Sequence, residues 1–133
     1  MARRLILDTG VLIATERQRH ETSAAISPDD DVVIAAISVA ELRTGIELAS
    51  PEHRQRRTEF LVRVLETLPV EPYDVATAEA HGRLLAHVSR DGRRRGAHDL
   101  IIAATAVATK RVVLTTDRAA RFGDLPGVQC IVV

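Results

Sequence analysis

The sequence is poor in aromatic residues and in cysteine. Aromatic side chains make up 2% of its 133 residues and Trp is absent, so the hydrophobic core must be built from Leu, Ile, Val and Ala. RNA binding through bases stacked on aromatic rings is disfavoured for the same reason. The single cysteine, Cys130, has no partner for an internal disulfide or for a zinc site, which indicates a reducing compartment.

The sequence also lacks a long apolar run and an excess of charge of one sign. No stretch reaches the roughly 18 apolar residues that cross a bilayer. The short apolar run behind Arg3 and Arg4 is interrupted by Asp8 and has no cleavage site after it, unlike a signal peptide. We therefore expect a cytoplasmic protein that does not bind membranes. Eighteen basic residues balance eighteen acidic ones, so net charge predicts no class of partner.

Uniformly apolar runs alternate with helical patterns along the whole chain. Strands are expected over residues 3–8, 32–37, 69–73, 111–117 and 128–133. Helices are expected over residues 11–26, 38–49, 51–68, 75–90 and 97–110. Because the strands show no polar face, they indicate an α/β fold with a parallel sheet covered on both sides. The length predicts a single domain over residues 1–133.

The first apolar run ends in Asp8, Thr9 and Gly10. Asp-Thr-Gly after a hydrophobic run is also how an aspartic protease presents its catalytic carboxylate. Those enzymes are nearly all β, whereas the residues after Gly10 look helical. Their second signature, a hydrophobic pair followed by Gly-Arg and Asn or Asp, is absent from this chain. Asp8 therefore belongs to some other chemistry.

Carboxylates fall where strands end and where the next helices begin. Asp8 and Asp117 follow apolar strands, and Glu41 and Asp99 are expected in the first turns of helices. In a parallel α/β sheet these places meet at one edge, where ligands bind. Each acid also has a simpler explanation: Glu41 completes a capping box with Ser38, and Asp99 and Asp117 are suitable N-caps.

Acids gathered at one edge repel one another and raise each other's pKa values. A bound cation removes that conflict. Since the chain has no cysteine cluster and no paired histidines at ligand spacing, oxygen ligation favours Mg²⁺ or Mn²⁺ over zinc. Hard cations held by carboxylates serve phosphate chemistry, where they activate water and neutralise charge on the leaving oxygen.

Four stretches of the chain, "LILDTGVLI", "ISVAEL", "AHDLIIAATA" and "VVLTTD", resemble the four acidic motifs of PIN-domain ribonucleases. Their spacing resembles that of the VapC toxins of toxin–antitoxin pairs. The resemblance implies a small, doubly wound, mostly parallel sheet flanked by helices. It also implies an Mg²⁺-dependent endoribonuclease in which metal-activated water cleaves RNA, a homodimer, and a small antitoxin partner. The catalytic and metal-binding residues that it implies are Asp8, Glu41, Asp99 and Asp117.

Other residues near these motifs are weaker candidates. Thr115 matches a hydroxyl position of the family and either holds Asp117 or a metal-bound water, or simply ends a strand. The run Arg93, Arg94 and Arg95 precedes the helix of Asp99 and either holds RNA phosphates or forms a solvated loop. Many relatives carry Ser or Asn at the position of Gly10, which leaves the metal affinity of this chain open.

Two other classes compete with the nuclease. A phosphoaspartyl receiver domain needs a lysine at the end of a late strand, but Lys110 precedes the strand at 111–117. A phosphatase of the dehalogenase type needs a second Asp two residues after the first, where this chain has Gly10. The remaining alternative is a non-catalytic RNA-binding module of the same fold, and a metal titration separates it from a nuclease.

Overall fold

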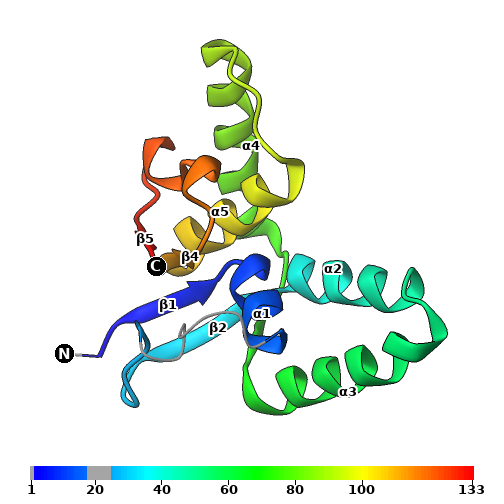
Figure 1. The fold of residues 1–133 in the computed structure, drawn as a ribbon. Coiled ribbons are helices and arrows are strands. Elements are labelled where there is room, and N and C mark those ends of the chain that lie inside the picture. Colours follow the sequence, from blue (N-terminus) through cyan, green and yellow to red (C-terminus); the bar gives the residue numbers. More distant parts are fainter. Residues whose placement is uncertain (1, 18–24) are drawn as a thin grey trace.

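The computed structural model describes residues 2–17 and 25–133. Its centre is a five-stranded sheet in the order β3-β2-β1-β4-β5, and all neighbouring strands are parallel (Figure 1). The strands are β1 (Arg4–Leu7), β2 (Asp31–Ala35), β3 (Val70–Glu71), β4 (Val112–Thr115) and β5 (Cys130–Val132). The predicted α/β fold with a parallel sheet flanked by helices is confirmed.

Helices connect the strands. They are α1 (Thr9–Glu16), α2 (Ala36–Glu47), α3 (Pro51–Thr67), α4 (Val75–Asp91) and α5 (Ala97–Thr109), followed by the 3₁₀ turns η2 (Arg118–Ala120) and η3 (Phe122–Asp124). None of the described helices is long and apolar enough to cross a membrane. The helix expected over residues 11–26 is shorter: it begins at Thr9 and ends at Glu16, and residues 18–24 lie outside the described part.

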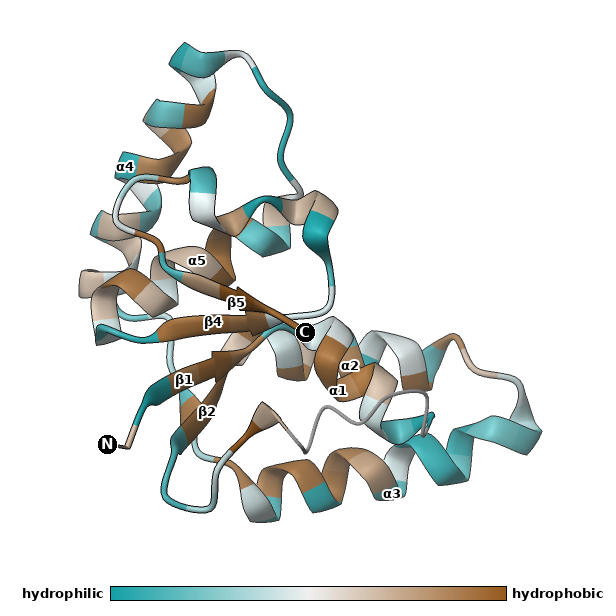
Figure 2. Cartoon of the chain, turned by 60° about the vertical axis from the view of Figure 1, so that its left-hand side comes forward, coloured by the Kyte–Doolittle hydropathy of each residue, from teal (hydrophilic) through white to brown (hydrophobic). Residues whose placement is uncertain are grey.

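Alternate residues of the strands point to opposite faces of the sheet, and helices bury both faces. Ile6 and Val113 pack in one apolar cluster with residues of α4 and α5. Leu7 and Leu114 pack in a second cluster with residues of α1 and α3. Figure 2 shows β1, β2 and β4 mostly in the brown of apolar residues, apart from the hydrophilic starts of β1 and β2. Burial on both faces explains why the sequence shows no polar alternation in its strands.

Helices α2 and α3 leave the sheet together as a hairpin (Figure 1). Arg54 donates a hydrogen bond of 3.0 Å to the carbonyl of Glu47, and Arg57 donates one of 3.0 Å to the carbonyl of Gly45. The last carbonyls of a helix have no partner within it. The arginines at the start of α3 therefore satisfy the end of α2 and fix the angle between the two helices.

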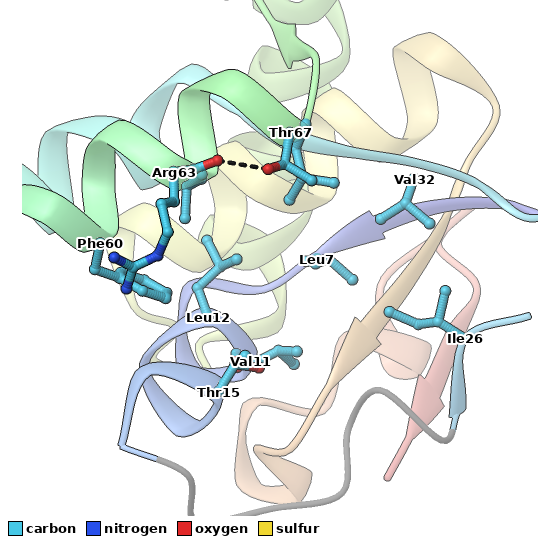
Figure 3. Close-up of a pocket in the computed structure, with 11 residues that line it drawn as sticks. Leu7, Val11, Leu12, Thr15, Ile26, Val32, Phe60, Arg63 and Thr67 are labelled. Atoms are coloured by element: carbon cyan, nitrogen blue, oxygen red, sulfur yellow. Dashed lines mark hydrogen bonds between the residues drawn. The ribbon is translucent and has the colours of Figure 1, made fainter. Parts of the chain in front are cut away.

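An apolar cavity of about 390 Å³ lies between α1, α3 and the strands β1 and β2. Figure 3 shows Leu7, Leu12 and Phe60 around it, with Arg63 beside Phe60. The guanidinium of Arg63 is 5.9 Å from the centre of the Phe60 ring. Among the residues that the structure describes, none that lines this cavity is acidic, so the cavity is separate from the carboxylates described next.

Candidate active site

Asp8 and Asp117 are joined through the hydroxyl of Thr115. Asp8 leaves the end of the central strand β1 and is only 6% exposed. Thr115, the last residue of β4, donates a hydrogen bond of 2.8 Å to Asp8 Oδ2. The same hydroxyl accepts a 2.9 Å bond from the backbone N–H of Asp117. Thr115 thus orients one carboxylate and fixes the backbone that carries the other, which is more than the strand-end role weighed from the sequence.

Glu41 is held by a second pair of hydroxyls. Thr9 donates to Glu41 Oε1 at 3.0 Å, and its Oγ1 lies 2.8 Å from Oγ of Ser38. Because an ionised carboxylate only accepts hydrogen bonds, the Thr9 proton points to Glu41 and Ser38 donates to Thr9. Ser38 is completely buried. Glu41 on α2 is therefore hydrogen-bonded to Thr9, the residue that follows Asp8 after the end of β1.

The predicted capping box of Ser38 and Glu41 is wrong. Helix α2 already begins at Ala36, its N-cap is Ala35, and no side chain caps it. Glu41 accordingly lies in the second turn of the helix and not in the first. The sequence pattern around Ser38 predicts a helix cap, but Ser38 is buried and makes its hydrogen bond to Thr9 instead. The feature of the sequence that could have indicated this contact is the presence of a polar residue, Ser38, in an otherwise apolar junction between a strand and a helix.

Asp99 lies in the first turn of α5 but does not cap it, since the N-cap is Gly96 and no side chain caps the helix. A Cβ added at Gly96 would lie 2.8 Å from Asp99 Oδ2, so the carboxylate folds back over the start of its helix and would have to shift if residue 96 carried a side chain. Sequence reasoning missed Gly96. At Gly10, in contrast, a Cβ would meet Thr116 Oγ1 at an ordinary 3.5 Å, so a side chain fits there.

The four carboxylates act on one another electrostatically. The pKa of Asp99 is raised to about 6, first by burial and then by the charges of Asp8, Asp117 and Glu41, in that order of size. Burial also raises the pKa of Asp8, against the lowering effect of its bond from Thr115. Besides its place at this edge, Asp117 caps η2, as the sequence suggested. Its Oδ1 accepts a 3.2 Å bond from the N–H of Ala120.

The oxygen atoms at this edge fit a hard cation. Carboxylates and hydroxyls are the ligands of Mg²⁺ and Mn²⁺ rather than of zinc, and the imidazole of His98, 3.7 Å from Glu41, is exposed. In the described ranges, 2–17 and 25–133, no group of three or more His, Cys, Asp or Glu side chains is placed closely enough to hold a metal ion by itself. Mg²⁺ does not require such a group, because it is commonly held by one or two carboxylates and keeps several waters.

The arginine run lies in the loop between α4 and α5. Arg95 donates 2.7 Å bonds to the carbonyls of Ala120 and Arg121, and Arg93 pairs with Asp91 at 3.6 Å. Arg95 therefore ties its loop to the segment that follows Asp117. Arg94 is exposed and makes no hydrogen bond or ion pair with other residues of the described structure, which leaves its charge available to an anion.

The raised pKa of Asp99 predicts how stability depends on pH. Its pKa of about 6 in the folded protein lies above the ordinary value of 3.8, so the folded state binds this proton more tightly. The contribution to the free energy of unfolding is present below about pH 4 and is lost as the pH rises through about 6. In EDTA, the melting temperature of Asp99→Asn relative to wild type should therefore rise between these values. A difference that is independent of pH would contradict the shift.

Comparison with known proteins places the chain in a family. The model of the PIN domain matches residues 5–126. Ribonuclease VapC5 of Mycobacterium tuberculosis is 39% identical over 84% of this chain and 82% of its own. A chain in the crystal structure of VapBC-5 from the same organism superposes with a TM-score of 0.80 at 32% identity, over 98% of both chains. A chain of VapBC2 from Rickettsia felis superposes with a TM-score of 0.87 at 18% identity, over 98% of both, which concerns the fold alone. The chain belongs to the PIN-domain family and, within it, to the VapC ribonucleases.

Proposed function

We propose that this protein is a metal-dependent endoribonuclease in which four acids of one sheet edge hold the metal and form the catalytic site. These acids are Asp8, Glu41, Asp99 and Asp117. As a VapC ribonuclease, the chain is an RNA-cleaving enzyme and the toxin of a toxin–antitoxin pair. The observation that supports the metal site is the convergence of the acids from four separate segments, two of them oriented by buried hydroxyl networks. We take residues 1–133 as one catalytic unit.

Different residues of the chain would have different roles in binding the metal, orienting the carboxylates and attracting RNA. Asp8 and Asp99, both with raised pKa values, would hold Mg²⁺ or Mn²⁺, and Glu41 and Asp117 would complete the ligand set. When bound, the metal activates water and neutralises charge on the phosphate. Thr115 and Thr9 fix the carboxylates before substrate arrives, so little reorganisation remains for the reaction itself. Arg93, Arg94 and Arg95 lie in the loop before α5 and would attract RNA phosphates by charge, with Arg94 the least engaged.

Cleavage should require a divalent cation. The purified protein is expected to cut RNA with Mg²⁺ or Mn²⁺, to stop in EDTA, and to leave 5′-phosphate and 3′-hydroxyl ends, because water rather than the ribose 2′-hydroxyl attacks phosphorus. End-labelled fragments checked with phosphatase and ligase identify the ends. Asp8→Asn, purified in parallel, controls for contaminating nucleases. Cyclic 2′,3′-phosphate ends or EDTA-resistant cleavage would refute the mechanism.

Membership in the VapC ribonucleases is incompatible with the receiver and phosphatase alternatives. The non-catalytic RNA-binding alternative makes a different prediction in the same assay. It requires RNA binding without cleavage at any metal concentration, and an unchanged melting temperature when Mg²⁺ is added.

We also propose a cognate antitoxin and a homodimer for this chain. Similar chains occur in structures of VapBC and FitAB, among them VapBC-5 and FitAB bound to a DNA fragment. An antitoxin segment that lies across the acidic edge would place a positively charged group among the carboxylates and so block the site. Sedimentation of the purified protein measures whether it is a dimer.

Expression of this protein alone should arrest growth, and expression together with its genomic neighbour should not. The reason is that an unblocked nuclease degrades the RNA of its own cell. Growth curves after induction measure the effect, with Asp8→Asn as the control for burden of expression. Harmless expression of an enzyme that cuts RNA in the test tube would contradict the toxin role and leave the nuclease standing.

A further inference from the structure

A small cavity adjoins the carboxylate edge. It measures about 100 Å³ and lies between the end of α1, the middle of α2, and α3. Glu41 lines it, together with Glu16, Arg57 and Phe60. Phe60, labelled in Figure 3, also borders the larger apolar cavity. A cavity of this size holds several waters and accepts the edge of a flat ring rather than a whole nucleotide.

Glu16 lines this cavity and has one buried oxygen without a hydrogen-bond partner. Its side chain is 9% exposed, and Arg56 Nε lies 3.9 Å from its Oε1, within reach of an ion pair but beyond a hydrogen bond. Within the described residues, one other buried side-chain atom lacks a hydrogen-bond partner, the donor Nε of Arg111. A buried carboxylate oxygen without a donor destabilises the fold, and a ligand that donates to it would remove that penalty.

Guanine fits the chemistry of the cavity better than the other bases. Single-stranded RNA is read by hydrogen bonds to the Watson–Crick edges of unpaired bases. Guanine presents two adjacent donors there, N1–H and N2–H₂, which match the two oxygens of one carboxylate. Adenine and cytosine present one amino group next to an acceptor nitrogen, and uracil one N–H between two carbonyls. A carboxylate therefore discriminates in favour of guanine.

The rest of the lining suits the same base. Arg57 uses Nη1 to bind the carbonyl of Gly45, and its other N–H groups can donate to guanine O6. The ring of Phe60 supplies an apolar surface against which a base packs. Since Glu41 is both a wall of the cavity and a carboxylate of the proposed catalytic site, a base seated there lies next to the reacting phosphate.

We propose that this cavity binds an unpaired guanine beside the phosphodiester that is cut, and that Glu16 selects it. The inference rests on the proposed function, because it takes RNA as the substrate of the carboxylate edge. The plain alternative is that Glu16 only pairs with Arg56 and holds α1 to α3.

The test uses four labelled oligouridylates that carry one central G, A, C or U. Binding is measured by fluorescence anisotropy in EDTA, and cleavage rate and position are measured in Mg²⁺. Wild type should favour the G oligonucleotide about tenfold in both assays, the usual size of one bidentate base contact, and should cut next to the G. Glu16→Gln keeps the shape but offers one acceptor, so the preference should fall to about one while the other three oligonucleotides behave as with wild type.

Glu66→Gln, an exposed glutamate of α3, is the matched control and should keep the preference for G. Equal binding of all four oligonucleotides by wild type would overturn the proposal. So would an unchanged preference in Glu16→Gln, or an equal loss on all four, which the ion-pair alternative predicts together with a lower melting temperature. Binding that favours G without any cleavage would support the pocket and refute the nuclease. Cleavage without base preference would support the nuclease and refute the guanine pocket.

Discussion

Replacing Asp99 with Asn is expected to abolish RNA cleavage without unfolding the protein. Loss of a residue that merely orients a metal ligand lowers affinity or activity by about 10- to 100-fold, so loss of a ligand should lower the cleavage rate by at least about 100-fold. The same substitution removes a charge from a half-buried site in which Asp8, Asp117 and Glu41 raise the pKa of Asp99. The metal-free variant should therefore be as stable as wild type or more stable.

The measurement pairs a cleavage assay with melting curves recorded with and without Mg²⁺. Added Mg²⁺ should raise the melting temperature of wild type more than that of Asp99→Asn, because stabilisation by a ligand scales with its affinity for the folded state. Asp29→Asn, the same chemical change at an exposed turn residue, should leave both readouts unaltered. If Asp99→Asn cuts RNA at the wild-type rate, Asp99 does not belong to the site.

Replacing Phe122 with Ala should produce a large loss of stability. Phe122 is 1% exposed and belongs to the apolar cluster that α4 and α5 form with the sheet. Truncating a buried Phe to Ala typically costs about 3–5 kcal/mol, through lost burial and the cavity left behind. Domains of this size are stable by only about 5–15 kcal/mol. The variant should therefore unfold at a much lower urea concentration than wild type.

Equilibrium unfolding in urea, followed by circular dichroism in EDTA, measures this loss. Leu48→Ala is the control, because Leu48 is 81% exposed and surface substitutions usually change stability by less than about 0.5 kcal/mol. A loss below about 1 kcal/mol for Phe122→Ala would show that the segment after Asp117 is not part of the cooperative core. Because Arg95 binds the carbonyls of that segment, the loop before α5 would then lose its anchor as well.

The sequence predicted the parallel sheet and the edge at which the acids meet, because both follow from periodicity and chain order. Local chemistry was sufficient for Asp74, which caps α4 as Asp commonly does: its carboxylate accepts a 3.0 Å bond from the N–H of Thr77. Local pattern failed where burial decides. Ser38 has the spacing of a capping residue, but a hydroxyl inside the fold gains more from Thr9 than from a helix end.

Two other features of the site were beyond the reach of the sequence. The space that Gly96 leaves for Asp99 depends on a side-chain rotamer, which no spacing reveals. The cavity beside Glu41 is formed by three helices, and its unsatisfied carboxylate is visible only once their relative positions are known.

The position of β1 in the sheet determines when, during synthesis of the chain, the proposed site can form. Asp8 is translated early, but the hydroxyl that orients it belongs to Thr115, 107 positions later, and β1 pairs with β4 on that side. A growing chain therefore extends by 107 residues after Asp8 before it contains the hydroxyl that orients this acid. We expect the proposed site to form only after β4 has left the ribosome, so that a ribosome is not exposed to an active form of the copy that it is still translating.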